Sequence, residues 1–530
     1  MKVFPMVLRS LILLALLLVP ATARAQAIDD KGAEALKGVL SGLLDEQITL
    51  GGQSGVQIIK EGPLSVEPSD SYYAVTFPHL SIRYPDGKQF EFGMLSINAV
   101  PHDKPGQWKM SIALPTPMLL LNDDGSELMR MNIGAQQAAG IWLEGTHYFT
   151  KMDSTYKDIA LTGENGLFEL SIPLTRIRYN LEDDQNGMLS GPISASLEGL
   201  RALFPQSGGT ATIGKLQTDF TLDRYNPKAE LAYRRKIQPL LENLQSDDLP
   251  SSSSENKAGE DMSTLQDAML ELFMNWGNGF SGTYSLEDLA VNMPAQGDKP
   301  ARQLRLKNAL SGFEIGDMLS DKAFLKVRAG HNGFFSNETP EKYKPFVPEN
   351  SNLDITARNV PLKAILELAA TTMSAVQSNP DMRQMAGLSL MMKVPALLSQ
   401  AGTIIEFENN YLENEAHKAD LNGQIKADMS AISSMTAQLR ATFAGLDALL
   451  TQAQILAADP EEPAAAQFAE MAKTLAQIKG WASVEQQAAG PLHVLNFELN
   501  TQGQMLLNGR DIKASAPAPA ALPPSTGTAQ

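Results

Sequence analysis

The sequence contains no cysteine. This absence excludes disulfide bonds, thiol nucleophiles, thiolate metal sites and lipid anchors attached to cysteine. A chain without disulfides must obtain its stability from an apolar core, and a hydrophobic content of 43% is sufficient for a large one. The length of 530 residues predicts two to four domains.

Aromatic residues and catalytic motifs are also scarce. Aromatics make up 6% of the chain, with four tryptophans, which disfavours the aromatic clefts typical of secreted glycosidases. The six histidines are widely spaced, and no H-E-x-x-H zinc motif, G-x-S-x-G elbow or phosphate-binding P-loop is present. We therefore expect no catalytic, cofactor-binding or metal-binding residues and no nucleotide partner. A hydrolase whose site is assembled from distant residues is the least favoured function.

Two segments partly resemble ligand sites but are better explained as turns. Residues 277–282 read G-x-G-x-x-G, but a predicted helix precedes them and a predicted strand follows, the reverse of the order in a dinucleotide site. Residues 182–187 resemble the start of a calcium loop, but the position that needs a bidentate carboxylate is Ile193. We predict a turn at both segments, and another at 122–125.

Long hydrophobic runs are missing except near the N-terminus. Lys2 and Arg9 precede nine apolar residues, Leu11–Val19, and the segment ends in Ala23-Arg24-Ala25. This is the pattern of a secretory signal peptide. Nine residues cannot span a bilayer core of ~30 Å, which needs about 20 in a helix. We expect residues 1–25 to be a signal peptide cleaved after Ala25 and the protein to be periplasmic; an uncleaved segment would tether it to the membrane.

The charge balance disfavours two classes of partner. Sixty acidic and 43 basic residues give a net charge of −17. A strongly acidic chain repels nucleic acid and anionic headgroups at long range, because both require a cationic surface. We expect no nucleic-acid partner, and the charge favours solubility.

The hydrophobic period divides the chain into a β-rich N-terminal part and a mixed C-terminal part. A helical period at 29–50 is followed by strand-like alternation from 56 to 225 and a helix-prone stretch at 227–244. We therefore expect a β-rich half at 26–245, a polar linker or loop at 246–261, an α+β half at 262–515 and a disordered Ala/Pro tail at 516–530.

The C-terminal half mixes both periods. We predict strands at 282–293, 303–313, 323–330, 403–407, 419–425, 494–499 and 504–508. We predict helices at 262–276, 362–376, 382–398, 432–456 and 464–478, the last two because they are rich in alanine.

Methionine is unusually common, with 23 residues. Its clusters include Met129 with Met131, Met382 with Met385, and Met391 with Met392. Flexible thioethers suit both irregular cores and adaptable apolar surfaces. We favour core filling.

Several phrases in the C-terminal half resemble known envelope proteins. They are residues 346–348, 353–366, 421–423, 445–450 and 497–509. Across residues 340–512 the chain is similar to the YdgA-like and AsmA-like periplasmic proteins and to alphaproteobacterial proteins of unknown function built in the same way. The resemblance implies large curved antiparallel sheets and an envelope role that involves lipid, and it carries over no catalytic residue. Those relatives commonly keep an N-terminal anchor, whereas the ending at Ala25 is typical of cleavage.

These observations predict an α+β fold with large curved antiparallel β-sheets in two halves and covering helices. We expect a non-enzymatic periplasmic envelope protein that binds lipid or another apolar ligand in a groove of the curved sheet. The alternative is a structural scaffold or assembly factor that binds an envelope protein.

Overall fold

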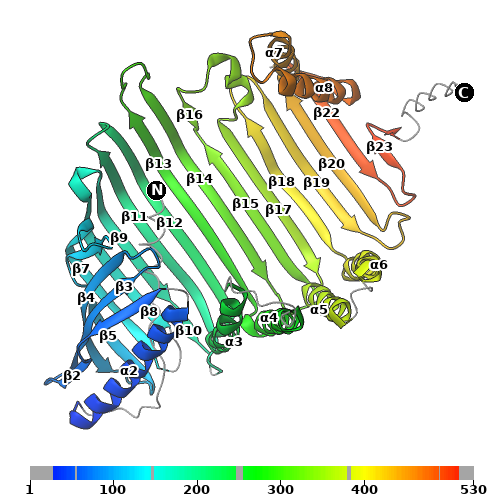
Figure 1. Cartoon of the computed structure of the whole chain (residues 1–530). Coiled ribbons are helices and arrows are strands. Elements are labelled where there is room, and N and C mark those ends of the chain that lie inside the picture. The colour runs from blue at the N-terminus through cyan, green and yellow to red at the C-terminus, as the bar shows by residue number, and fades with distance from the viewer. Residues whose placement is uncertain are drawn as a thin grey trace, which may run out of the picture. The chain divides into compact units, whose positions relative to one another are not determined.

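The computed structural model describes residues 28–53, 56–144, 148–184, 186–245, 255–378, 383–488 and 490–512. The chain forms two compact units. Unit 1 takes residues up to 338 together with 362–390, and unit 2 takes 339–361 together with those from 391 onward. Antiparallel strands dominate both units (Figure 1), which confirms an α+β fold built mainly on antiparallel β-sheet. The predicted signal peptide, its cleavage site and the predicted tail lie outside the described residues.

Unit 1 is built on strands that alternate apolar and polar residues, so that each strand has an apolar and a polar face. Its strands are β1 (Gln57–Glu61), β2 (Ser65–Pro68), β3 (Tyr73–Arg83), β4 (Gln89–Pro101), β5 (Gln107–Ala113), β6 (Met118–Leu121), β7 (Glu127–Leu143), β8 (Phe149–Gly163), β9 (Glu169–Asn180), β10 (Glu182–Asp183), β11 (Leu189–Phe204), β12 (Gly209–Tyr225), β13 (Gly279–Met293), β14 (Arg302–Gly316), β15 (Ala323–Asn332) and β16 (Phe335–Ser336). Nine of them pair antiparallel in the order β5-β7-β8-β9-β11-β12-β13-β14-β15.

A glycine faces a residue of unusual backbone conformation at two places in the long strands. Asp288 in β13 has φ of 51°, and the pairing of β12 with β13 is interrupted at Asp288 and the facing Gly214 without a change of register. A Cβ on Gly214 would lie 3.0 Å from the Cβ of Asp288, so a larger residue would force the strands apart. Asp158 in β8 has φ of 53° and faces Gly134 at a similar interruption between β7 and β8.

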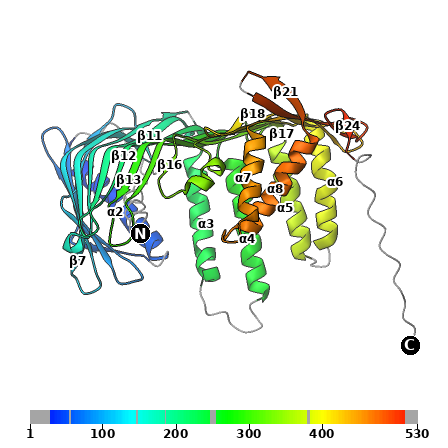
Figure 2. The same ribbon diagram turned by 90° about the horizontal axis from the view of Figure 1, so that it is seen from above.

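Helix α2 (Asp30–Gln53) fills the inside of the curled N-terminal strands (Figure 2). Its first turn is capped because the Asp29 carboxylate accepts a hydrogen bond from the Gly32 amide at 2.7 Å. The apolar stripe that the sequence predicts, which includes Leu36, Leu40 and Leu43, is buried in the main core of unit 1. This part of the curved sheet is therefore a filled core and not an open groove.

Unit 1 contains three further helices. Helix α3 (Pro227–Gln245) follows β12, α4 (Glu255–Trp276) precedes β13, and α5 (Leu362–Ser378) lies beside α4. Lys236 of α3 and Glu271 of α4 form an ion pair at 3.0 Å. Both α3 and α4 extend away from the strand ends (Figure 2).

Unit 2 is also built on antiparallel strands. Its strands are β17 (Asn350–Val360), β18 (Ile404–Glu413), β19 (Lys418–Ala427), β20 (Met435–Ala444), β21 (Ser483–Gln487), β22 (Gly490–Leu499), β23 (Met505–Leu507) and β24 (Arg510–Asp511). The central order is β17-β18-β19-β20-β22. The remaining helical elements are η2 (Glu341–Phe346), α6 (Arg383–Ala401), α7 (Leu446–Ala458) and α8 (Ala465–Trp481). Of α6, only residues from 391 onward belong to unit 2. No helix among the described residues combines the length and the apolar character needed to cross a membrane.

A buried carboxylate joins η2 to the loop between α7 and α8. The side chain of Glu462 accepts hydrogen bonds from Lys342 Nζ at 2.6 Å, from the Tyr343 hydroxyl at 2.6 and 2.7 Å, and from the Ala464 amide at 3.1 Å. These bonds, first that of Lys342 and then that of Tyr343, lower the pKa of Glu462 from 4.5 to about 2. Glu462 is therefore a structural anion in unit 2.

The structure differs from the sequence predictions in three places. Residues 435–444, predicted as part of a helix at 432–456, form strand β20, and α7 begins only at Leu446. Alanine, leucine, glutamine and arginine favour a helix there, but pairing with β19 and β22 overrides that preference. Helix α4 already starts at Glu255, inside the predicted linker 246–261, whose first part, 246–254, is not described. The two compact units are divided near 338–362 and 390, away from that segment.

Candidate functional site

The most distinctive surface of unit 1 is one face of strands β12–β15, which we call the aromatic face. The register places its residues side by side, because Phe220 pairs with Gly282, Gly282 with Phe313, and Phe313 with Val327. Because successive side chains of a strand point to opposite faces, every second residue lies on the same face. Its apolar members are Leu216, Phe220, Leu222, Phe280, Tyr284, Leu286, Phe313, Ile315, Leu325 and Val327. The opposite face carries polar residues such as Lys215, Gln217, Asp219, Thr283, Glu314, Lys326 and Arg328.

The aromatic rings of this face touch one another in a continuous chain. Ring centroids are 5.5 Å apart for Phe220 and Tyr284, 6.4 Å for Phe220 and Phe313, 5.5 Å for Phe280 and Phe313, and 4.6 Å for Trp276 and Phe280. Most of these contacts are edge-to-face, which is the favourable arrangement for aromatic pairs. The rings therefore form a connected apolar surface with a defined geometry.

Gly282 makes this arrangement possible. It lies on the aromatic face between Phe220 and Phe313, and a Cβ there would be 2.6 Å from ring atoms of both. The absence of a side chain lets the two rings lean over the strand. Gly282, which the G-x-G-x-x-G pattern brought to attention, therefore serves ring packing and not a nucleotide.

Trp276 is held at the edge of the aromatic face by the junctions between helices and strands. The Asn226 amide donates to the Trp276 carbonyl at 2.7 Å, and the Asn278 amide donates to the Asp223 carbonyl at 2.9 Å. These bonds fix the end of α4 against the end of β12. The turn predicted at 277–282 is confined to residues 277–278, which form this connection, whereas 279–282 already belong to β13.

A polar group adjoins the aromatic chain where α3 begins. Tyr225 contacts Trp276 at 5.1 Å between ring centroids, and Tyr148 contacts Tyr225 at 5.4 Å. The hydroxyls of Tyr148 and Tyr225 share a hydrogen bond of 2.6 Å, and Tyr148 also donates to Glu230 at 2.7 Å. The apolar surface thus ends at a hydrogen-bonded network.

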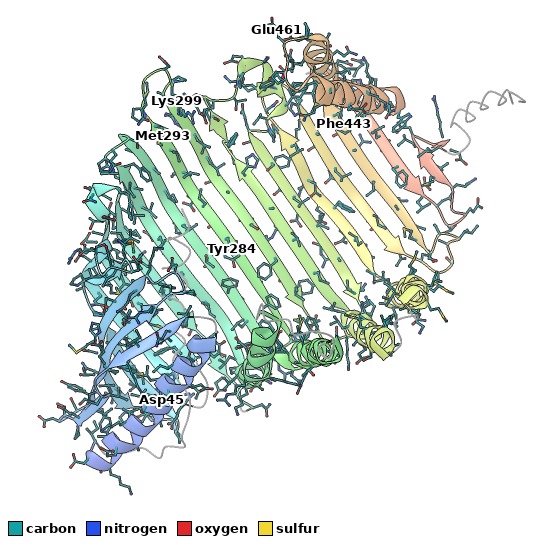
Figure 3. All side chains as sticks on the ribbon, in the orientation of Figure 1. Asp45, Tyr284, Met293, Lys299, Phe443 and Glu461 are labelled. Carbon is teal, nitrogen blue, oxygen red and sulfur yellow. The ribbon has the colours of Figure 1, made fainter. Side chains whose placement is uncertain are left out.

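The apolar face continues under helix α2 at one end and is uncovered at the other. A single register row runs across nine strands through Met110, Gly140, Met152, Tyr179, Ile193, Phe220, Gly282, Phe313 and Val327. Met110 is 2% exposed, whereas Val327 is 49% exposed and Tyr284, in the next row, is 45% exposed. Figure 3 shows Tyr284 in the middle of β13, away from Met293 at the strand end and from the helices. The aromatic face is therefore the part of the unit 1 core that the described residues leave open.

Burial affects the phenols near the covered part of this face. It raises the pKa of the Tyr156 and Tyr179 hydroxyls.

Two cavities lie elsewhere. One of about 690 Å³ opens over β5, β7, β8 and β9, and its lining includes the charged residues Lys109, Lys151, Asp153 and Arg178. These residues alternate with Met110 and Met152 and so belong to the polar face. The other, of about 600 Å³, lies at a bulge of β18 and β19 in unit 2 and is lined mainly by Asn, Gln and Glu. We assign no chemistry to either cavity.

Unit 2 also has an apolar sheet face, which we call the second apolar face. One of its register rows contains Ile355, Phe407, Gly423, Leu439, Phe497 and Leu507. The neighbouring row on the opposite face contains Thr356, Glu406, Gln424, Gln438 and Glu498. The two-faced character of the strands is thus shared by both units.

The sequence motifs that resembled ligand sites are structural in the described residues. The Asp184 carboxylate accepts bonds from the amides of Asn186 and Met188 at 2.8 and 2.9 Å, which closes the turn predicted at 182–187. These bonds lower the pKa of Asp184. Over the described residues, no group of three or more His, Asp or Glu side chains is arranged to hold a metal ion.

Sequence reasoning missed one histidine contact. His493 is buried, with Nε2 3.8 Å from Asp447 Oδ1, and Lys479 Nζ lies 2.7 Å from the same oxygen. Lys479 contributes most to lowering the pKa of Asp447. The three residues come from α7, α8 and β22 and link the two helices to the sheet.

Sequence reasoning also missed the aromatic face as a site. Phe220, Phe280 and Phe313 come from three different strands, and only the register brings them together. The available signal was the alternation of Phe280, Gly282 and Tyr284 around a glycine inside a strand.

Comparisons of the chain with protein-family models, with curated proteins and with solved structures give no match in any of the three.

Proposed function

We propose that the protein binds an elongated apolar ligand, such as the acyl chain of a lipid, on the aromatic face, and that it acts as a non-enzymatic envelope protein in the periplasm. The observation that carries this proposal is the exposure of Tyr284 and Val327 on a face whose other end is a buried core. An exposed apolar surface of this kind marks a binding site more often than it serves stability.

The chemistry of the aromatic face suits an acyl chain better than a polar ligand. Each methylene removed from water contributes about 0.8 kcal/mol, so burying about ten methylenes would contribute roughly 8 kcal/mol before the costs of association. At one end the face adjoins the network of Tyr148, Tyr225 and Glu230, whose groups bond to one another and in which Tyr225 is buried. The feature of the ligand that the face matches is therefore its apolar chain.

We also propose the finer architecture on which this function depends. Two curved halves would each keep one apolar sheet face, with helices over part of it. Helix α2 occupies that role in unit 1, which limits the binding surface to the strands beyond it.

Two matched variants test the binding site. Val327→Asp places a carboxylate on the aromatic face, while Leu310→Asp places one on the opposite face of the neighbouring strand β14, where Leu310 is 40% exposed. We expect Val327→Asp to weaken uptake of a fluorescent fatty acid at least tenfold, which corresponds to about 1.4 kcal/mol. Leu310→Asp should leave the uptake unchanged.

Two results would count against the proposal. Native mass spectrometry that finds no co-purifying lipid, together with no uptake of the fatty acid by the wild-type protein, would refute ligand binding. Equal effects of the two variants on fatty-acid uptake would show that the binding site is not on the aromatic face.

The periplasmic location is tested separately. N-terminal sequencing of the purified protein should begin at Gln26. A sequence that begins at Met1 would show that the segment is retained.

A further inference from the structure

Four large apolar side chains of unit 2 are unusually exposed. Met391 and Met392 of α6 and Met429 and Ile432 of the turn between β19 and β20 have exposed fractions between 58% and 81%. We call these four residues the methionine patch. Methionines such as Met110 in unit 1 fill the core, as the sequence predicted, but those of the patch do not.

The patch joins a helix to a turn that is held against it. The amide of Met429 donates to Ser399 Oγ of α6 at 2.6 Å. Met392 and Ser399 are seven residues apart, so they lie on the same side of the helix and about 10 Å apart along it. The two methionines of α6 and the apolar residues of the turn therefore belong to one end of the unit.

The turn itself is rigid. The Asp428 amide donates to the Ser434 carbonyl at 3.0 Å, and the Asp428 carboxylate accepts from the Ser430 amide at 2.9 Å. The Ile432 amide donates to the Thr501 carbonyl at 2.9 Å. Ile432 is therefore held outward by the backbone.

The patch is continuous with the second apolar face. Met435 starts β20 directly after the turn and shares its face with Leu439, as strand alternation requires. Met435 is itself exposed. An apolar chain could thus pass from the patch onto the second apolar face without crossing a polar row.

The charge beside the patch supports a bilayer as the partner. The part of α6 that belongs to unit 2, residues 391–401, contains one basic residue, Lys393, and no acidic residue, although the whole chain has a net charge of −17. A helical segment with exposed apolar residues, a basic residue and no carboxylates fits the phosphate-rich interface of a bilayer, where apolar side chains insert below the headgroups. A protein partner would not require this combination.

We propose that the methionine patch docks the protein on a lipid bilayer, where lipid enters or leaves the second apolar face. The docking itself does not depend on the proposed function, whereas the proposed transfer of lipid does.

Flotation of the full-length mature protein with phosphatidylcholine vesicles tests the docking. The patch variant combines Met391→Gln, Met392→Gln, Met429→Gln and Ile432→Gln. The control variant makes the same change at three other exposed apolar residues of unit 2 that lie on helices α7 and α8, namely Ile455, Met471 and Trp481. We expect the patch variant to lose at least tenfold in vesicle binding, with an unchanged thermal midpoint, and the control variant to bind like the wild type.

Three outcomes would overturn the docking proposal. The wild type fails to float with the vesicles, both variants lose binding equally, or the patch instead mediates a dimer that the patch variant abolishes in the absence of vesicles. Fatty-acid uptake in solution separates the two proposals, because a wild type that takes up fatty acid but ignores vesicles retains the proposed function and loses only the docking.

Discussion

Replacing Leu40 in α2 by alanine tests whether this helix fills the curved sheet. Leu40 is 0% exposed and lies in the core cluster of unit 1 together with Trp108 and Trp142. Removing a fully buried leucine side chain leaves a cavity that a rigid sheet closes only in part. Measured costs of such changes are about 3–5 kcal/mol. We expect Leu40→Ala to lower the free energy of unfolding of unit 1 by that amount.

The two tryptophans supply a local assay. Trp108 and Trp142 are both buried in the same cluster, so their fluorescence during urea denaturation reports the unfolding of unit 1. A two-unit chain need not unfold in one step, which makes a probe inside the affected core preferable to a global signal. Glu34→Ala on the exposed side of α2 is the matched control, with an expected effect within about 0.5 kcal/mol.

A small effect of Leu40→Ala would refute the reasoning. A loss below about 1 kcal/mol, similar to that of Glu34→Ala, would mean that α2 does not pack inside the sheet. The apolar face of β3–β8 would then also be open, and the proposed binding surface would be larger than the aromatic face.

Three further predictions concern single residues. Gly42→Ala should stabilise unit 1 by about 0.5–1 kcal/mol in the same urea assay, because Gly42 is within α2 and an added Cβ would meet nothing within 4 Å; a destabilised variant would contradict the described environment. Gly282→Val should cost about 1–3 kcal/mol and reduce fatty-acid uptake, since its side chain would push Phe220 and Phe313 apart; an unaffected uptake would separate ring packing from binding. The lowered pKa of Glu462 stabilises the folded state above pH 4.5, and this contribution disappears as the pH falls toward about 2; the wild type should therefore lose stability over this range more steeply than Glu462→Gln, and parallel curves of unfolding free energy against pH would refute it.

The helix and strand periods of much of the chain could be predicted from the sequence. Helix α2 could be predicted because apolar residues recur on one side of each helical turn. The strands after it could be predicted because apolar and polar residues alternate along them. These patterns are local, because each reflects which side of a short segment faces the core. The turn at 182–187 was equally readable, since Asp184 closes it with its own neighbours.

The prediction failed where distant strands decide the local structure. Residues 435–444 contain good helix formers, but β19 and β22 lie on either side of them and offer hydrogen bonds along the whole segment. The sequence of residues 435–444 gives no sign of which other strands will pair with this segment.

By itself, the sequence determined that the strands have one apolar and one polar face, that cysteine chemistry is absent and that no local catalytic motif is present. Only the tertiary structure decided which part of the apolar face is covered, because the strands under α2 and the strands beyond it present the same alternation in sequence. The register placed Phe220, Gly282 and Phe313 in one row and so created the aromatic face. The tertiary structure also left Met391 and Met392 of α6 exposed, although other methionines fill the core. Burial depends on which elements meet, and this information is spread over the whole chain.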